Sequence, residues 1–201
     1  MDFTPNHFFW ILLGYLLGSF PTGVVLSRNK YGLDVREMGS GNIGATNITR
    51  VFGWYAGALV FLVDFLKGLF PLLFLRYWYP HDEWVLTYTG IALVFGHCFS
   101  AYLKFRGGKG VATSLGCLVA VMPWAAITGG AVYLLLLAVV RISAVGSLGG
   151  ILAVLIFLVF DKPSLPATAL VLAVSALVIV RHHSNIRRLV GDVKAGSRQR
   201  K

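Results

Sequence analysis

Long apolar runs separated by short polar segments set the pattern of this chain. A helix needs roughly 20 residues to cross a hydrocarbon core of about 30 Å. Hydrophobic residues make up 57% of the sequence and charged residues only 13%, whereas a soluble domain carries about 25% charged residues. The pattern predicts an all-α integral membrane protein rather than an unusually apolar soluble domain. The apolar runs cover residues 8–27, 54–75, 84–103, 111–140, 144–160 and 165–180.

The run at 111–140 is too long for one crossing. It holds thirty residues without a formal charge, and a straight helix of that length would measure about 45 Å. Pro123, Gly129 and Gly130 offer a break near its middle. We therefore divide it into two short spans, which brings the predicted number of transmembrane helices to seven.

The distribution of Lys and Arg supports seven spans and sets their orientation. Fifteen of the eighteen basic residues fall on one face, Arg76 and Lys162 fall on the other, and Lys67 lies inside a span. Cytoplasmic loops carry the excess of Lys and Arg, so we expect the N-terminus outside and the C-terminus in the cytoplasm. A single crossing by 111–140 would weaken this bias sharply. The fifteen are Arg28, Lys30, Arg36, Arg50, Lys104, Arg106, Lys109, Arg141, Arg181, Arg187, Arg188, Lys194, Arg198, Arg200 and Lys201.

The net charge of +10 points to membrane lipids as partners and not to nucleic acid. Basic residues beside apolar spans contact anionic headgroups at the cytoplasmic face. We treat residues 1–193 as a single transmembrane domain and 194–201 as a basic cytoplasmic tail. Cys98 and Cys117 stand alone in apolar surroundings, so we expect small core residues rather than a disulfide or a metal site.

The polar segment 39–50, GSGNIGATNITR, is a candidate phosphate cradle. Its glycines permit close backbone approach, and exposed N–H groups beside an arginine bind anions. An ordinary loop that caps the next span explains the composition slightly better, and both interpretations stay open. The polar side chains of the segment include Ser40, Asn42, Thr46, Asn47 and Arg50.

The segment 104–113, KFRGGKGVAT, is a stronger candidate for anion binding. Gly107, Gly108 and Gly110 leave Lys109 on flexible backbone at the start of a predicted helix, where an anion is favoured. A simple membrane anchor would need Lys104 and the other cations but not so many glycines. The surplus of glycine therefore favours a functional loop.

Ionisable residues inside apolar runs mark three further positions. His97 is a functional candidate or a neutral histidine bonded to a neighbouring helix, and the two interpretations are equally supported. Asp64 and Lys67 lie three residues apart, so they can pair on one helix. We expect a buried pair that satisfies itself, with support of the site's loops as a second role.

The segment RHHSNIRRL, which follows the last apolar run, carries polar groups that a lipid anchor does not need. At helical spacing His182, Asn185 and Arg188 share one face. A basic tail on lipid headgroups would explain the arginines but neither the histidine nor the asparagine. This segment is therefore a third part of the candidate site.

Taken together, five strings resemble the bacterial acyl-phosphate-dependent glycerol-3-phosphate acyltransferase family. They occur in the family's order and cover nearly the whole chain. The resemblance implies a seven-span enzyme of the bacterial inner membrane, with its active site facing the cytoplasm. The strings are YLLGSFPTG at 15–23, GSGNIGATN at 39–47, DFLKG at 64–68, GHCFSAYLKFRGGKGVAT at 96–113 and HHSNIRRL at 182–189.

The activity that the resemblance implies is transfer of a fatty acyl group from acyl phosphate to the sn-1 hydroxyl of glycerol 3-phosphate. The product is lysophosphatidic acid, in the first committed step of phospholipid synthesis. No cofactor or metal is implied, and a soluble enzyme that makes acyl phosphate is a candidate partner at the basic face.

The resemblance also implies roles for individual residues. Glycerol phosphate contacts fall on Ser40, Arg50, Lys109, His182 and Asn185, and the last three are the candidate catalytic residues. Asp64, Lys67 and Arg188 are expected to support the site. The expected acyl-phosphate-binding residues are Asn42, Thr46, Asn47, His97, Lys104, Gly107, Gly108 and Gly110.

Two positions depart from the family pattern. Ser100 stands where the family usually has proline, and Gly191 is followed by Asp192 and Val193 where the family commonly has Gly-x-Glu. The first departure concerns the end of the third span. The second puts any role of that glutamate in doubt, although Asp192 is a candidate substitute.

The implied chemistry suits these residues. Acyl phosphate is an activated mixed anhydride, so the site works mainly by positioning two anions and stabilising the charge that shifts onto oxygen. The acceptor hydroxyl must lose a proton. His182 is the obvious side-chain base, and the substrate's own phosphate is the competitor. We favour the phosphate, with His182 and Asn185 orienting the acceptor.

Two other functions are weighed against this one. A transporter for a phosphorylated small solute would use Asp64, Lys67 and the broken run at 111–140, but it needs binding groups near the midplane. A lipid transferase that uses a nucleotide-activated head group would need acidic metal-binding clusters, and the chain has only eight acidic residues. No histidine is followed by Asp at the fifth position, as an HxxxxD acyltransferase motif requires.

Overall fold

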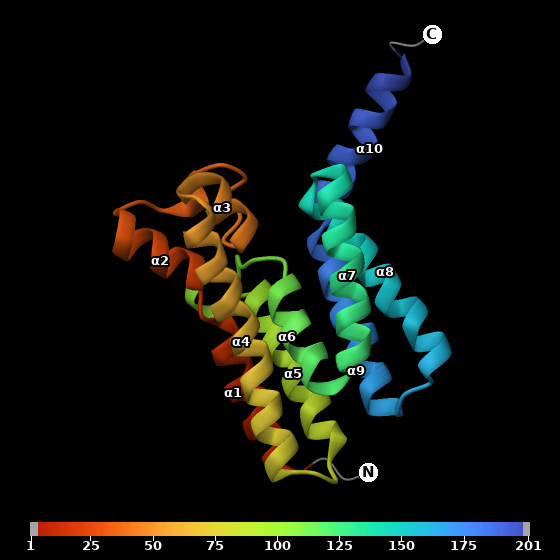
Figure 1. Cartoon of the computed structure of the whole chain (residues 1–201). Helices are drawn as coiled ribbons and strands as arrows, with labels where there is room; N and C mark the ends of the chain where they lie inside the picture. Colours follow the sequence, from red (N-terminus) through yellow and green to blue (C-terminus); the bar gives the residue numbers. More distant parts are fainter. Residues whose placement is uncertain (1–3, 199–201) are drawn as a thin grey trace.

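The computed structural model describes residues 4–198, with side chains up to Gly191, and this part of the chain is helical without strands (Figure 1). The predicted tail, 194–201, thus lies outside the described side chains. Two short 3-10 helices, Val35–Glu37 (η1) and Ala101–Leu103 (η2), accompany the α-helices. The α-helices are α1 (Pro5–Ser19), α2 (Thr22–Tyr31), α3 (Ala45–Phe52), α4 (Trp54–Trp78), α5 (Glu83–Cys98), α6 (Val111–Val121), α7 (Pro123–Val140), α8 (Ser143–Asp161), α9 (Leu165–Arg181) and α10 (His183–Arg198).

Prolines divide two of the apolar runs. The first run was expected to be one helix over 8–27, but the structure separates α1 from α2 at Phe20–Pro21, where proline has no N–H to continue the helix. The predicted break at Pro123 is confirmed, because α6 ends at Val121 and α7 begins at Pro123. The expectation of two short spans is wrong for α7, which has 18 residues.

Five segments of the described chain are long and apolar enough to cross a membrane. A sixth is obtained if α9 and α10, which are bent by 53°, are taken together. With 11 residues α6 reaches only about 16 Å. In its last turn the Arg76 guanidinium donates to the Ala120 carbonyl at 2.8 Å, which satisfies one of the carbonyls that a helix end leaves without an intrahelical partner. The segments are Pro5–Tyr31, Trp54–Trp78, Glu83–Leu103, Pro123–Val140 and Ser143–Asp161.

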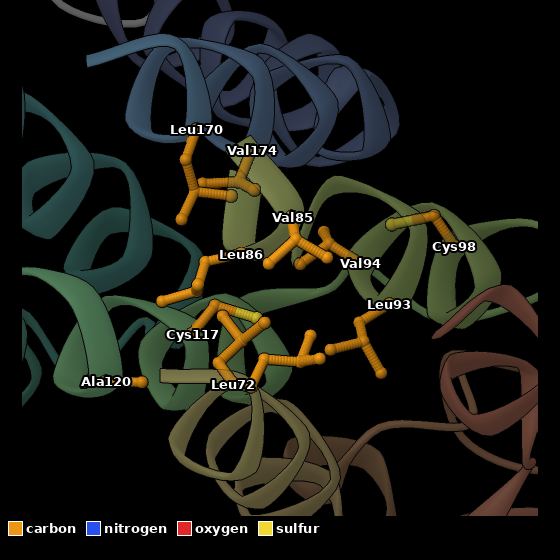
Figure 2. Packing of buried hydrophobic residues seen from close by; sticks show 11 residues of the cluster. Leu72, Val85, Leu86, Leu93, Val94, Cys98, Cys117, Ala120, Leu170 and Val174 are labelled. Carbon is orange, nitrogen blue, oxygen red and sulfur yellow. The ribbon is translucent and has the colours of Figure 1, made fainter. Parts of the chain in front are cut away.

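The largest core cluster joins α4, α5, α6 and α9 around apolar side chains (Figure 2). Leu72, Leu93 and Leu170 are fully buried there, and Cys98 and Cys117 are buried free cysteines as predicted. Where α4 and α6 cross, a Cβ added to Gly68 would lie 2.2 Å from the Thr113 carbonyl oxygen. The absence of a side chain therefore lets the two backbones touch.

All three polar strings lie at the same end of the helices. In Figure 1 α2, α3 and the start of α10 are at the end opposite the N-terminus, and the segment that leads into α6 rises toward them. Large apolar side chains on the outer surfaces of α7 and α8, such as Leu134, Leu135, Val159 and Phe160, are exposed. This distribution suits helices that face lipid, with the polar strings gathered at one end of the helices.

Candidate active site

The centre of the candidate site is a contact between two of the predicted strings. The Lys109 ammonium, two residues before α6, donates to Oδ1 of Asn185 in α10 at 2.5 Å. Lysine has only donors and the asparagine oxygen only accepts, so the Asn185 NH2 group keeps its two hydrogens for another partner. The contact places the predicted catalytic residues of 104–113 and 182–188 in one site.

Positive charges surround Lys109. Partial burial, together with the positive charges of Arg188, Arg181 and Arg50, lowers the pKa of Lys109 to about 8. Among the described residues none of these four cations forms an ion pair with a carboxylate. A cluster of unpaired cations attracts anions, and a bound phosphate would return the pKa of Lys109 toward its ordinary value.

The glycine turn before Lys109 is held on two sides. On one side the Gly107 and Gly108 N–H groups donate to the carbonyls of Cys98 and His97, at 3.2 and 2.9 Å. On the other side the Arg181 guanidinium donates from Nε to the Gly108 carbonyl at 3.0 Å and from a terminal nitrogen to the Gly107 carbonyl at 2.9 Å. The conformation of both glycines is therefore set by their neighbours.

Sequence reasoning did not assign a role to Arg181 beyond its charge. It lies directly before His182 at the end of an apolar run, where an arginine ordinarily anchors a span at the headgroups. Only the adjacent His182 indicated that Arg181 could belong to the candidate site. Its contact with Gly108, 73 positions away, leaves no local pattern in the sequence.

His97 packs against the same turn from inside the helix bundle. It is buried, and a Cβ added to Gly108 would lie 2.2 Å from its Nε2. Its Nδ1 lies 3.8 Å from the Asp64 carboxylate. His97 thus touches the predicted phosphate turn through the imidazole ring and also links it to α4.

The predicted pairing of Asp64 with Lys67 is confirmed. Their charged groups lie 2.7 Å apart and both side chains are almost fully buried. Asp64 also accepts a hydrogen bond from Thr22 at 2.8 Å, and Lys67 donates to the Phe20 carbonyl at 2.9 Å. The pair therefore joins α4 to the break between α1 and α2.

His182 occupies the junction between α9 and α10 and is buried. Its Nδ1 lies 2.8 Å from the Val178 carbonyl oxygen. A carbonyl can only accept, so Nδ1 carries the hydrogen and Nε2 of the neutral ring is an acceptor. His182 can therefore receive a hydrogen bond from a hydroxyl, whereas its neighbour His183 is exposed.

The loop at 39–47 is organised around Asn47. Its buried amide donates to the carbonyls of Met38 at 3.0 Å and Asn42 at 2.9 Å, and its Oδ1 accepts from the Ser40 N–H at 2.8 Å. The Asn42 side chain in turn accepts from the Gly44 N–H at 2.9 Å. These contacts use both side-chain amides to shape the loop and leave the hydroxyl of Ser40 exposed at its surface.

The side chains of two predicted site residues, Thr46 and Lys104, make no hydrogen bond or ion pair with the other predicted site residues among those described. The hydroxyl of Thr46 lies 3.1 Å from that of Ser143 at the start of α8, and Ser143 lies 3.2 Å from the Tyr133 hydroxyl. Ser143 and Tyr133 had no signal in the sequence because they lie in apolar helices. Lys104 is exposed, with a left-handed φ of 52°, and its side chain makes no hydrogen bond or ion pair within the described part of the chain.

Metal ligands and cavities are two further features that can mark a site in the described part of the chain. The described residues contain no group of three or more His, Cys, Asp or Glu side chains arranged to hold a metal ion. A cavity of about 360 Å³ lies near the α4–α5 and α8–α9 turns, where Arg76, Glu83, Met122 and Phe157 line it. None of the predicted site residues contributes to that cavity.

Comparison with known proteins identifies the family. The family model described as "Glycerol-3-phosphate acyltransferase" matches residues 8–192. A glycerol-3-phosphate acyltransferase of Trichlorobacter lovleyi is 45% identical over 93% of this chain and 95% of the relative. One of Aquifex aeolicus is 41% identical over 90% of this chain and 94% of the relative.

Solved structures agree. Two crystal structures of PlsY (YgiH), an integral membrane glycerol 3-phosphate acyltransferase, each cover 92% of this chain and 92% of their own. The glycerol 3-phosphate form is 40% identical with a TM-score of 0.88, and the lysophosphatidic acid form is 38% identical with a TM-score of 0.85. The family model and relatives of this identity and coverage show that this chain belongs to the glycerol-3-phosphate acyltransferase family.

Proposed function

We propose that this chain transfers a fatty acyl group from acyl phosphate to the sn-1 hydroxyl of glycerol 3-phosphate, releasing lysophosphatidic acid and phosphate. The observation that carries the proposal is the cluster of unpaired cations around the Lys109–Asn185 contact, beside a buried histidine whose Nε2 is an acceptor. Relatives solved with glycerol 3-phosphate and with lysophosphatidic acid support the acceptor and the product.

For the acceptor, the proposed ligands are Ser40, Arg50, Lys109, His182 and Asn185, of which the last two lie at the α9–α10 junction. Lys109 and Arg50 supply positive charge to the phosphate, and the exposed Ser40 side chain adds a hydroxyl. The Nε2 of His182 accepts from a substrate hydroxyl, and the free NH2 of Asn185 donates to a substrate oxygen. This set positions the acceptor for attack.

For the donor, the proposed site is the glycine turn with the N-terminus of α6. The first N–H groups of a helix lack intrahelical partners and favour an anion. Gly107, Gly108 and Gly110 keep side chains away from the phosphate, and Lys109 lies between the two substrate sites. His97 and Asn47 contribute by shaping the backbone, as their buried contacts indicate.

The reaction requires no covalent enzyme intermediate. The acceptor oxygen bonds to the acyl carbon, the carbon–oxygen bond to phosphate breaks, and the phosphate leaves with that electron pair. Lys109 and the helix N-terminus stabilise the negative charge that develops on the leaving phosphate. We favour the substrate's phosphate as the group that takes the hydroxyl proton, because the cations around the site disfavour a protonated histidine.

We further propose seven helical passes in the bacterial inner membrane, with the site facing the cytoplasm. If α6 enters from the cytoplasmic face and α7 returns to it, Lys109 and Arg141 lie on the same side, as the positive-inside rule requires. This arrangement holds even though α6 is too short to span the bilayer alone. A soluble acyl-phosphate-producing enzyme would then deliver its product to the basic face.

The test is a donor comparison with purified protein in detergent and without added metal. Glycerol 3-phosphate is supplied with palmitoyl phosphate and, separately, with palmitoyl-CoA. We expect lysophosphatidic acid from palmitoyl phosphate only. Robust product from the thioester, or no product from the phosphate, contradicts the proposal. Replacing His182 by Gln distinguishes the two candidate bases, the His182 imidazole and the substrate's phosphate. Loss of turnover with intact acceptor binding would favour the imidazole.

A further inference from the structure

We propose that Arg181 is a positioning residue that fixes the glycine turn at 107–108, so that the acyl donor's phosphate meets Lys109 and the N-terminus of α6 rather than carbonyl oxygens. The identity of the donor rests on the proposed function, whereas the positioning of the turn does not. Arg181 is the last residue of α9, in a different part of the chain from the turn.

The contacts of Arg181 are specific to arginine. One planar guanidinium donates from two nitrogens to two consecutive carbonyls, those of Gly108 and Gly107. The spacing of the two donors is fixed by the fork of the side chain. Lysine has a single nitrogen at its tip and cannot reproduce both directions, although it keeps the charge.

The turn needs such support because of its composition. Two successive glycines lose more backbone entropy on ordering than other residues do. Their N–H groups are already bonded to the end of α5, at Cys98 and His97. The bonds to Arg181 fix the carbonyl side, so each of the two glycines is held through both its N–H and its carbonyl group.

The direction of the carbonyls matters for an anion. A carbonyl oxygen carries partial negative charge and repels phosphate, whereas N–H groups and the Lys109 ammonium attract it. By accepting from Arg181 the two oxygens are turned toward a cation and are neutralised in part. A turn without Arg181 is free to rotate these oxygens toward the ligand.

The position of Arg181 also explains how the proposed donor and acceptor sites keep a fixed position relative to each other. Its Cζ lies 5.2 Å from the centre of the Phe99 ring, so the guanidinium is supported on one face. The next residue is His182, at the junction that leads to Asn185. One side chain therefore ties the donor's turn to the helix end that carries the proposed acceptor ligands.

The test combines kinetics with amide hydrogen exchange. Arg181→Lys is compared with wild type and with the matched control Arg187→Lys, which changes an exposed arginine of the same segment. We expect the KM for palmitoyl phosphate to rise about tenfold, as loss of one charged hydrogen bond predicts. The KM for glycerol 3-phosphate should change less than about threefold, and exchange in the segment 104–113 should accelerate about tenfold.

A merely structural role gives a different result. Misfolding of a fraction of the protein lowers the apparent kcat but leaves both KM values of the folded fraction unchanged. Wild-type exchange at 104–113 and a wild-type donor KM in Arg181→Lys would overturn the proposal, and so would equal changes in Arg187→Lys. If the lysine variant does not fold, Arg181→Gln takes its place, since it removes the charge but keeps an amide donor. The same two measurements, the donor KM and the exchange at 104–113, then decide the proposal by the same outcomes. If wild-type enzyme fails to use palmitoyl phosphate, the proposed function fails and the exchange measurement alone decides the role of Arg181.

Discussion

Lys109 and Asn185 are joined by a 2.5 Å hydrogen bond across 76 positions of sequence. The contact connects the turn before α6 with the first turn of α10, so two segments that were predicted separately to handle an anion form one site. Lysine supplies the charge and asparagine fixes where that charge lies.

Lys109→Ala should lower kcat/KM by about 100-fold, because it removes the cation that we propose stabilises the developing charge on phosphate. Arg106→Ala is the matched control, since it removes an exposed cation from the same loop. We expect less than a threefold change in the control. Equal losses in both variants would show that the loop acts only through its net charge.

The pH dependence of binding should follow Lys109, whose pKa is about 8 in the empty site instead of 10.5. Above pH 8 the free enzyme loses this charge, so affinity for glycerol 3-phosphate should fall by up to about tenfold per pH unit. Lys109→Arg should remove the decline, because arginine stays charged. Isothermal titration calorimetry of glycerol 3-phosphate binding to the wild type and to Lys109→Arg, from about pH 7 to about pH 10, checks this prediction.

Stability should move in the opposite direction over the same range. The pKa of Lys109 is lower in the folded protein than in the unfolded chain, so the unfolded chain binds more protons between about pH 8 and 10.5. The contribution of this group to stability therefore rises with pH there. A thermal melt that falls in parallel with affinity would point to unfolding rather than to deprotonation of Lys109.

The two glycines of the turn should respond differently to a second mutation. An alanine at 108 meets the His97 ring, whereas an alanine at 107 meets the His97 backbone carbonyl at 2.1 Å. We expect Gly108→Ala and Gly107→Ala both to lower the unfolding temperature. His97→Ala should restore part of the loss in Gly108→Ala and none in Gly107→Ala, as measured by thermal melts in detergent.

Replacing only one member of the buried Asp64–Lys67 pair should lower the free energy of unfolding strongly. Lys67→Met leaves the carboxylate buried without its cation, which should reduce the free energy of unfolding by about 3–5 kcal/mol. The double variant Asp64→Leu with Lys67→Met removes both charges and should lose less than the sum of the two single variants. Strict additivity would contradict direct coupling of the two groups.

Ser100→Pro should leave stability within about 1 kcal/mol of wild type. Ser100 has a φ of −63°, which proline adopts, and its N–H donates no hydrogen bond among the described residues. Its hydroxyl donates to the Ser19 carbonyl at 2.5 Å, and Ser100→Ala should lose about 1 kcal/mol with that bond. A large loss in the proline variant, judged by chemical denaturation, would show that the serine is required.

Much of the fold could be predicted because hydrophobicity alone decides which segments enter a bilayer. The runs at 54–75, 144–160 and 165–180 match α4, α8 and α9 to within a few residues. The eight-residue helix α3 was not expected, because it lies in a polar segment and is too short to show a clear pattern.

The site was predictable as a set of strings but not as a set of contacts. Glycine surplus and polar residues beside apolar runs marked Lys109 and Asn185. Arg181 and Ser143 were missed because their partners, Gly107–Gly108 and Thr46, lie far away in sequence. Their chemistry depends on tertiary packing, which leaves no periodicity in a single chain.

The hydrogen bond between His182 and the Val178 carbonyl has one further consequence. The far side of the imidazole ends on a peptide oxygen, which neither supplies nor keeps a proton at neutral pH. Among the described residues, the only hydrogen-bond partner of this side of the ring is thus a group that cannot pass a proton on into α9. A proton taken up by the ring at Nε2 would therefore have to leave again on the side that faces the candidate site.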